Sequence, residues 1–381
     1  MGYWRAMRTE SPIQALQTAP GIAPERVQVA VIGGGLTGMA VASGLRDHGV
    51  EVHLFEAGDD LAGGMATRGM GIASTLLLDP PFRLIQAVGL QTARDILRFT
   101  AEGVRAWGDD LHQTGVVYAT KGTAEAEEIP LNLRALADLG IDARPWSSTV
   151  EGLGDGWTVP SDGLLDLERV TRRMALALPH STASCAVAIE DDDSDLRVRF
   201  EDGRTVLADI VVMTGGAQVT PWAADKFHPV RHQALATQAV DALIPQPMHI
   251  QYGYTSALQR PSGEVFLSGC RWATPHLEMG ETDDTVISEA VDARLSGFLH
   301  QHWPALSRAS VTHRWTAIMT FTCDGLPILG PLPGRPRIIS CGGFGAYGPS
   351  FALRAAQAVV DGIMTGESPG VPECFTTRRF D

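Results

Sequence analysis

The stretch VQVAVIGGGLTGMAVASGLRDHGVEVHLFE, residues 27–56, decides the fold of this chain. Residues 27–32 are apolar and rich in β-branched side chains, which predicts a buried parallel strand. A glycine-rich turn follows, and apolar residues then recur at helical spacing until Gly49 supplies a stop signal. Residues 51–55 predict a second strand. A glycine motif between a strand and a helix is typical of dinucleotide-binding βαβ units.

Each position of the Gly33-x-Gly35-x-x-Gly38 motif has a physical task. The first glycine permits a tight turn, the second lets a pyrophosphate approach the backbone, and the third lets helix and strand pack closely. The helix N-terminus offers N–H groups and a positive dipole end to phosphates. Glu56 can accept a hydrogen bond from a ribose 2′-hydroxyl, and its charge disfavours a 2′-phosphate. The predicted contacts of this unit are Gly33, Gly35, Leu36, Thr37, Gly38, Glu56 and Ala57.

Length and composition limit the possible functions. A chain of 381 residues is long enough for about two domains. The net charge of −14 argues against nucleic acid and anionic membranes as partners. No apolar run is long enough to span a bilayer, and the first 26 residues lack the apolar core of a cleaved signal. The five cysteines lack metal-binding or redox spacing and indicate reduced thiols. We therefore expect a soluble, cytoplasmic protein.

The rest of the chain alternates between two kinds of pattern. Short strands separated by acidic turns predict an antiparallel meander over residues 184–207, followed by a buried strand at 209–213. Helices are predicted over 80–112 and 125–139, and residues 229–271 alternate like a half-exposed antiparallel sheet. The predicted strands of that sheet are 231–237, 249–254 and 264–268. The dinucleotide-binding elements are thus split by the other segments, which predicts two interleaved domains.

Together these features resemble the FAD-dependent amine oxidoreductases of the D-amino-acid oxidase, glycine oxidase and sarcosine oxidase superfamily. The resemblance covers nearly the whole chain. Its landmarks are VAVIGGGLTG…LFE at 29–56, a glycine-rich loop with Arg68, ADIVVMTGGA at 208–217, and Trp315…TCDGLPILGP…CGGFGAYG at 315–348. Tyr3-Trp4 and the TCDGLPILGP run look most like the γ-glutamylputrescine oxidase branch.

The resemblance implies an α/β (α+β) fold in which a Rossmann-type FAD-binding domain is interleaved with an antiparallel-sheet substrate domain, as in glycine oxidase. The implied ranges are an N-terminal arm (1–26), the FAD-binding domain (27–80, 150–225 and 320–366), the substrate-binding domain (81–149 and 226–319) and a C-terminal tail (367–381). In such proteins the second glycine cluster faces the flavin, and its N–H groups stabilise the reduced ring. Further implied FAD contacts are Arg68, the Val187 backbone, Thr214, Gly215, Gly342, Gly343, Phe344, Gly345, Ala346 and Tyr347.

Three positions depart from the family pattern. Where sarcosine oxidases attach flavin through a cysteine, the alignment through Cys323 places Ala317, so we expect non-covalent FAD. Some relatives activate oxygen with a lysine, but neither Lys121 nor Lys226 falls in the matching sheet region. Histidine is frequent in the second glycine cluster of the family, whereas Phe344 and Tyr347 stand in this sequence.

The substrate side is predicted to come from the antiparallel sheet. Arg271 can clamp a substrate carboxylate through two parallel hydrogen bonds. Tyr252 and Tyr254 are expected on one face of a strand, as a pocket wall or as packed core. Each such residue, taken alone, is more often structural. The candidates are His232, Tyr252, Tyr254, Arg271, Trp315 and Tyr347. His300-x-His302 indicates a solvated helix end, and no metal site is predicted.

The leading hypothesis is an FAD-dependent oxidase of a primary or secondary amine or amino acid, giving an imine and hydrogen peroxide. One alternative is a flavin dehydrogenase that passes electrons to a quinone or a protein carrier. The absence of a lysine at the oxygen-activating position favours this alternative. Another is a flavoprotein kept for a biosynthetic-partner role without turnover of its own. The expected partners are the small amine or amino acid, molecular oxygen and, as a possibility, a second copy of the chain.

Overall fold

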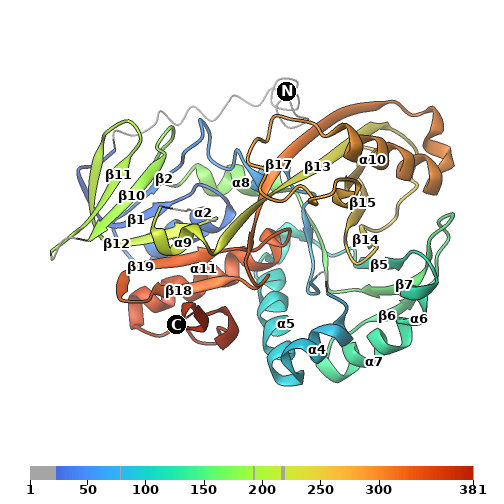
Figure 1. Ribbon diagram of the computed structural model, residues 1–381, viewed down its shortest axis with the longest axis horizontal. Helices are drawn as coiled ribbons and strands as arrows, with labels where there is room; N and C mark the ends of the chain where they lie inside the picture. The colour runs from blue at the N-terminus through green and yellow to red at the C-terminus, as the bar shows by residue number, and fades with distance from the viewer. Residues whose placement is uncertain (1–22, 78, 192–193, 216–218, 381) are drawn as a thin grey trace. The chain divides into compact units, whose positions relative to one another are not determined.

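The computed structural model describes residues 23–77, 79–191, 194–215 and 219–380 (Figure 1). The predictions for Tyr3-Trp4 and for residues 216–217 of the ADIVVMTGGA run fall outside these ranges. The chain forms two compact units. The first, which we call the Rossmann unit, contains the described residues of Gln14–Thr67, Asp166–Pro229 and Met319–Asp381. The second, the sheet unit, contains those of Arg68–Leu165 and Val230–Ile318.

The Rossmann unit is built on a sheet whose central strands run parallel. β1 (Arg26–Ile32) lies between β2 (Val52–Phe55) and β12 (Thr205–Thr214). All four residues of β2 are buried, as expected for a strand covered on both faces. The sheet order is β10-β11-β12-β1-β2-β9, and β19 pairs with both β12 and β18. The other strands are β9 (His180–Ser181), β10 (Ala186–Asp191), β11 (Leu196–Phe200), β18 (Ile328–Leu332) and β19 (Arg335–Gly342).

Two helices of the Rossmann unit cross at close range. α2 (Leu36–Asp47) follows β1, and α11 (Gly348–Thr365) follows the second glycine cluster. A Cβ on Gly44 of α2 would lie 2.9 Å from a methyl of Val360 on α11, so glycine allows this crossing. The smaller helices are α8 (Leu167–Ala175), α9 (Pro221–Ala224) and the 3-10 turns η4 (Glu373–Phe375) and η5 (Thr377–Phe380).

The sheet unit is organised around a mixed sheet with the order β17-β13-β16-β15-β14-β5-β7-β6. α10 (Glu289–His302) packs on one core of this sheet through Val291, Leu295 and Phe298. A second cluster forms around Phe266 and Trp315. The strands are β5 (Val116–Thr120), β6 (Arg144–Trp146), β7 (Gly154–Val159), β13 (Phe227–Ala239), β14 (Met248–Ile250), β15 (Thr255–Gln259), β16 (Glu264–Gly269) and β17 (Val311–Thr322).

The remaining elements of the sheet unit are helices and one small sheet. α4, α5 and α7 contact one another, and β8 lies between β3 and β4. Their bounds are β3 (Ile72–Ala73), α4 (Pro81–Val88), α5 (Leu90–Arg105), β4 (Leu111–His112), α6 (Thr123–Glu127), α7 (Ile129–Leu139) and β8 (Gly163–Leu165).

The mixed α/β fold predicted from the sequence is confirmed, and some boundaries are corrected. The segments predicted as strands 205–207 and 209–213 form one continuous strand, β12. The strand predicted over 249–254 ends at Ile250, because Gln251 and Tyr252 take left-handed backbone angles (φ 55° and 54°). Residues 68–80 and 150–165 belong to the compact sheet unit, although the predicted FAD-binding ranges include them. That one unit binds FAD and the other binds substrate remains a prediction.

Candidate active site

The turn after β1 needs glycine for steric reasons. Gly33 has φ 110°, and a Cβ on it would lie 2.7 Å from the carbonyl oxygen of Thr214. A Cβ on Gly38 would lie only 1.9 Å from the carbonyl oxygen of Gly33. The Thr214 hydroxyl is buried and lies 2.9 Å and 3.0 Å from the carbonyl oxygens of Ile32 and Gly33. Thr214 therefore supports the turn from within the protein.

Gly35 differs from its neighbours because nothing lies within 4 Å of the position a Cβ would take. Gly35 is the N-cap of α2, and no side chain caps this end of the helix with a hydrogen bond. The N–H groups of the first helical turn have no partner within the helix, so this end of α2 can bind an anion. Leu36 and Thr37 begin the helix with buried side chains, so they would contact a ligand through their backbones. Open space at an N-terminus fits a pyrophosphate.

Glu56 holds the far side of the same turn. Its carboxylate accepts hydrogen bonds from the N–H of Gly34 at 2.7 Å and from the N–H of Gly58 at 2.8 Å. Each carboxylate oxygen can accept more than one hydrogen bond, so a ribose hydroxyl can still be accommodated. Ala57 follows in an exposed position. The residues at this turn fit the adenosine diphosphate part of FAD.

The second glycine cluster is packed against the end of β17. Gly343 and Gly345 both take left-handed angles (φ 78° and 52°). A Cβ would lie 2.2 Å from a methyl carbon of Thr322 at the first and 2.6 Å from the ring of Phe321 at the second. The N–H of Gly345 donates to the carbonyl oxygen of Thr320 at 2.9 Å. Two positions in this loop thus require glycine, because a side chain at either one would collide with β17.

Side chains of the cluster turn inward. Phe344 is buried and stacks on Phe351 of α11, with ring centroids 5.2 Å apart. Tyr347 is buried, and its N–H donates to the carbonyl oxygen of Phe344 at 2.8 Å. Ala346 is exposed. Phe344 would therefore meet a ligand through its backbone.

Val187 lies at an irregularity of the meander. The register of β10 against β11 shifts between Ala186 and Ala188, and Val187 is half exposed. A bulge frees the backbone groups of one residue from the regular ladder. This geometry is compatible with the predicted backbone contact to adenine.

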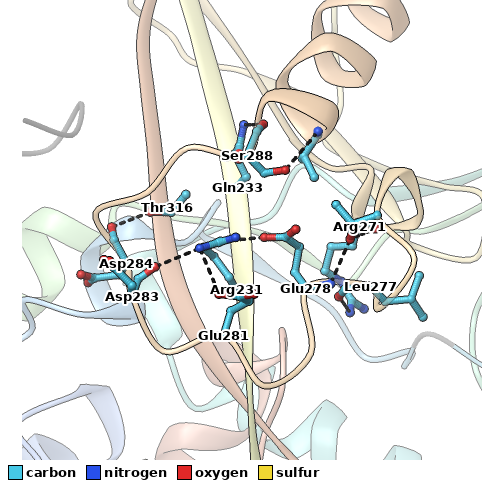
Figure 2. Close-up of polar contacts among 12 residues, drawn as sticks. Arg231, Gln233, Arg271, Leu277, Glu278, Glu281, Asp283, Asp284, Ser288 and Thr316 are labelled. Atoms are coloured by element: carbon cyan, nitrogen blue, oxygen red, sulfur yellow. Dashed lines mark hydrogen bonds and ion pairs between the residues drawn. The ribbon is translucent and has the colours of Figure 1, made fainter.

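In the sheet unit, two of the predicted substrate residues, His232 and Tyr254, lie near Arg271, which is carried by the loop between β16 and α10 (Figure 2). Arg271 lies at the start of this loop with its guanidinium 5.7 Å from the ring centre of Tyr254. Burial lowers the pKa of Arg271, while Tyr254 and Glu278 raise it. Burial lowers the pKa of His232 to about 4, and the charge of Arg271 adds to this effect. At neutral pH the group is therefore one cation beside a neutral imidazole and a phenol ring.

A buried ion pair lies beside this group. Arg231 of β13 donates from Nε to Glu278 Oε2 at 2.6 Å, and the two side chains are 8% and 5% exposed. Figure 2 shows Glu278 between Arg231 and Arg271. Neither member of the pair is among the site residues predicted from the sequence. A signal was present, since an arginine within a predicted strand needs a buried partner.

Comparison with known proteins identifies the family. The family profile described as DAO, FAD dependent oxidoreductase, matches residues 28–361. The chain belongs to this DAO family. Glycine oxidase of Pseudomonas putida is 24% identical over 90% of this chain and 95% of its own length. The MnmC bifunctional protein of tRNA 5-methylaminomethyl-2-thiouridine biosynthesis from Thiobacillus denitrificans is 24% identical over 96% of this chain and 61% of its own.

Solved structures show the same fold. Glycine oxidase from Geobacillus kaustophilus has a TM-score of 0.75 at 19% identity, covering 93% of this chain and 99% of that one. L-proline dehydrogenase from P. horikoshii has a TM-score of 0.78 at 18% identity, covering 94% and 98%. The predicted superfamily, its two-domain fold, FAD as cofactor and an oxidoreductase activity are thereby confirmed. The likeness to the γ-glutamylputrescine oxidase branch stays a prediction.

Two predicted site residues of this DAO-family chain, Arg68 and Trp315, have other contacts. Arg68 forms an ion pair with Asp284 and donates to the carbonyl oxygen of Thr316 at 3.2 Å. Trp315 is 2% exposed, and its indole N–H donates to the carbonyl oxygen of Arg68 at 2.9 Å. Both residues therefore serve the packing of the sheet unit, and their roles toward FAD or substrate remain predictions.

Tyr252 and Tyr254 do not share a strand face, contrary to the prediction. Both lie in the turn between β14 and β15. The Tyr252 hydroxyl donates to Glu128 at 3.0 Å, and Arg83 lies over its ring at 5.0 Å. Tyr254 is exposed, close to Arg271. Only Tyr254 of the two joins the Arg271 group.

The lysines and cysteines have ordinary contacts. Lys226 pairs with Asp225, and Lys121 lies over the ring of Phe298. No disulfide joins the five cysteines, all of which fall in the described part. Across the described ranges, no group of three His, Cys, Asp or Glu side chains could hold a metal ion. Nor does any described helix have the length and apolar character to span a bilayer.

Proposed function

We propose that this DAO-family protein is an oxidase of a primary or secondary amine or of an amino acid, with FAD held non-covalently. The observation that carries this proposal is the half-buried Arg271 beside a neutral His232, within a chain of the DAO family. A guanidinium in such surroundings favours a carboxylate ligand, because burial strengthens charge-assisted hydrogen bonds. The glycine oxidase relatives are compatible with an amino-acid substrate.

FAD, when bound, would supply the redox chemistry, a two-electron oxidation of the substrate's carbon–nitrogen bond to an imine with reduction of oxygen to hydrogen peroxide. The residues of the chain supply binding and orientation. The first turn of α2 and Glu56 would hold the pyrophosphate and a ribose, and the backbone at Gly342–Gly345 would hold the ring and its developing charge.

Arg271 would orient the substrate through its carboxylate. Tyr254 covers one side of the guanidinium, which limits the directions from which a carboxylate approaches. His232 stays neutral at physiological pH, since burial lowers its pKa to about 4. The imidazole can therefore accept or donate a hydrogen bond without adding charge, and it does not compete with Arg271 for the anion.

The decisive experiment is spectroscopic. The absorption spectrum of the purified protein is recorded, and the protein is precipitated with acid. The native protein is then mixed anaerobically with candidate amines and amino acids before air is admitted. We expect flavin that leaves with the acid supernatant, bleaching by one substrate class, and recovery in air with peroxide. Bleaching without recovery in air would indicate the dehydrogenase alternative. A protein that never binds FAD contradicts the proposal.

A variant separates amino acids from simple amines as substrates. Arg271→Met removes the guanidinium and keeps a chain of similar length. For an amino-acid substrate we expect kcat/KM to fall by about a hundredfold or more, because a charge-assisted pair to the carboxylate is lost. An amine without a carboxylate should be affected much less. Equal losses for both classes would show that Arg271 serves the fold and not the carboxylate.

A further inference from the structure

The loop that carries Arg271 has an unusual backbone. Cys270, Leu277 and Glu278 all take left-handed angles (φ 53°, 52° and 59°), although none of them is glycine. Such conformations are costly for residues with a Cβ, so surrounding contacts must hold them. Strained positions of this kind gather at binding and catalytic sites. Here they lie directly beside the proposed carboxylate-binding residue.

Arg231 holds the loop at Glu278. Its N–H donates to the carbonyl oxygen of Glu278 at 3.0 Å, and its Nε donates to the carboxylate of the same residue. A second carboxylate, that of Glu281, lies 3.4 Å from Nη1. Arg231 thus binds the backbone and the side chain of Glu278 at once, in nearly complete burial. Its charge is matched by acidic groups of the loop.

Glu278 is close enough to Arg271 to influence it. Its negative charge raises the pKa of Arg271, against the effect of burial. The two residues are also linked through the backbone, because Arg271 Nη1 donates to the carbonyl oxygen of Leu277 at 3.1 Å (Figure 2). A carboxylate in this place could pair with Arg271 and compete with a substrate carboxylate. In the structure, however, Glu278 is bound to Arg231.

We propose that Arg231 is a specificity-determining residue: by binding the Glu278 carboxylate it keeps that group off Arg271, which can then receive a substrate carboxylate. This inference rests on the proposed role of Arg271 in substrate binding. Without Arg231, the Glu278 carboxylate would be left to pair with Arg271, whose pKa it already raises, and the protein would close its own binding site with an internal ion pair. Arg231 acts through Glu278 and is not itself a contact of the substrate.

The test compares two small probes of similar shape, acetate and acetamide, which differ in charge. Each is titrated into the FAD-loaded protein, and its dissociation constant is read from the change in flavin absorption. We expect the wild type to bind acetate at least tenfold more tightly. Arg231→Met should reduce this preference about tenfold, which corresponds to the loss of one charge-assisted interaction. Arg231→Met combined with Glu278→Gln should restore it to within about threefold, because the competitor is gone.

The rescue distinguishes this role from a structural one. If Arg231 served only to hold the loop, removal of a second buried group would weaken the preference further. Gln233→Met is the matched control: Gln233 lies two residues along the same strand, is 1% exposed and holds the loop at Ser288 (2.9 Å), away from Glu278. It should leave the preference for acetate unchanged.

The remaining outcomes also support or overturn the proposed role of Arg231. Glu278→Gln alone should keep the preference, so the inference stays testable if Arg231→Met does not fold; a loss equal to that of Arg231→Met would overturn it. A double variant that is not rescued overturns it as well. A wild type without any preference for acetate would contradict the proposed role of Arg271, and the inference would fall with it. Preference in the wild type without effect of Arg231→Met would overturn the inference alone.

Discussion

The glycine turn of the Rossmann unit and the Arg271 loop of the sheet unit, the two candidate ligand sites, are built differently. In the turn after β1, the important positions are those without side chains: Gly33 and Gly38 allow close backbone contacts, and Gly35 leaves open space. In the loop after β16, charged side chains carry the geometry, with Arg231 and Glu278 buried against each other. One site is built from backbone dipoles and the other from ionised groups.

This difference has a consequence for specificity. Backbone N–H groups suit a ligand that every member of a family shares, since they depend little on the identity of nearby side chains. Charged side chains can be exchanged one at a time, so they suit a substrate that differs between relatives. The comparison therefore predicts that substitutions in the turn act on folding and cofactor binding. Substitutions in the sheet unit should act on the substrate and on the response to pH.

The largest expected effect comes from the turn. Gly38→Ala would place a Cβ 1.9 Å from the carbonyl oxygen of Gly33, a backbone atom that cannot swing away as the end of a flexible side chain could. We expect the free energy of unfolding to fall by about 3 kcal/mol or more, visible as a lower thermal midpoint with or without FAD. Gly35→Ala is the matched change. Its Cβ meets no protein atom, so stability should be unchanged while FAD affinity drops at least tenfold.

Equal effects of the two alanines would contradict this account. If Gly35→Ala also lowered the thermal midpoint of the apoprotein, that glycine would serve the fold. If it bound FAD normally, the open space beside Gly35 would not be the pyrophosphate position. Fluorescence titration of FAD and thermal denaturation of the apoprotein separate the two effects.

The same contrast explains how much could be predicted from the sequence. The βαβ unit follows from local signals, because glycine, apolar spacing and an acid at the strand end all act within thirty or so residues. The family resemblance then located the second glycine cluster. The end of β14 could not be predicted from alternation, since nothing in the sequence marks the left-handed Gln251 and Tyr252. The Arg231–Glu278 pair joins segments 47 residues apart, and only the three-dimensional fold brings them together.

A second prediction concerns Asp162 of the sheet unit, which is fully buried. Burial raises its pKa from 3.8 to about 7, and the hydrogen bonds from Thr75 oppose this only in part. The folded state thus holds this proton more tightly than the unfolded state. The contribution of Asp162 to the free energy of unfolding should be most favourable below about pH 4. It should decrease by up to about 4 kcal/mol as the pH rises to about 7.

Asp162→Asn isolates this contribution, because the amide cannot ionise and retains hydrogen-bonding groups toward Thr75. Urea denaturation between about pH 4 and pH 8, which spans most of the interval between the two pKa values of this group, should show the variant gaining stability relative to the wild type as pH rises. Thr75→Val removes the hydroxyl partner at 2.6 Å. In this variant stability should decrease more with rising pH than it does in the wild type. A constant difference between wild type and Asp162→Asn over this range would refute the assignment.

The Rossmann unit contains a buried group, His53, whose pKa is shifted in the opposite direction. His53 of β2 is 6% exposed, and its Nε2 lies 2.9 Å from the Ser181 hydroxyl. Burial lowers its pKa from 6.5 to about 4, with a smaller contribution from His180. The unfolded state takes up this proton first, so stability is lost as pH falls from 6.5 towards 4, by up to about 3 kcal/mol.

His53→Gln keeps a hydrogen-bonding group for Ser181 and removes the charge change. Its unfolding free energy should therefore depend less on pH than that of the wild type in the acid range, although it is lower at pH 7. His232 and His249 of the sheet unit also have pKa values lowered to about 4, so the His53→Gln variant should retain some acid sensitivity. Identical slopes for variant and wild type would exclude a contribution of His53.

The smallest effect is expected where side chains support the backbone site from a distance. Arg379 in η5 donates to both carboxylate oxygens of Asp324, at 2.6 Å and 3.0 Å. Asp324 lies 3.1 Å from the Thr322 hydroxyl, and the Thr322 methyl fills the space that a Cβ on Gly343 would need. The C-terminal turn thus supports the second glycine cluster. Arg379→Ala should lower stability by about 1–2 kcal/mol.

Because the support is indirect, we also expect FAD affinity to decrease only about threefold, less than for Gly35→Ala. Arg378→Ala, at an exposed neighbouring position, should change neither quantity. Arg379→Lys can make only part of the paired contact and should fall between wild type and alanine. If Arg379→Ala weakened FAD binding as strongly as Gly35→Ala, side chains would control the cofactor loop as they control the Arg271 loop. The contrast between a backbone-built and a side-chain-built site would then fail.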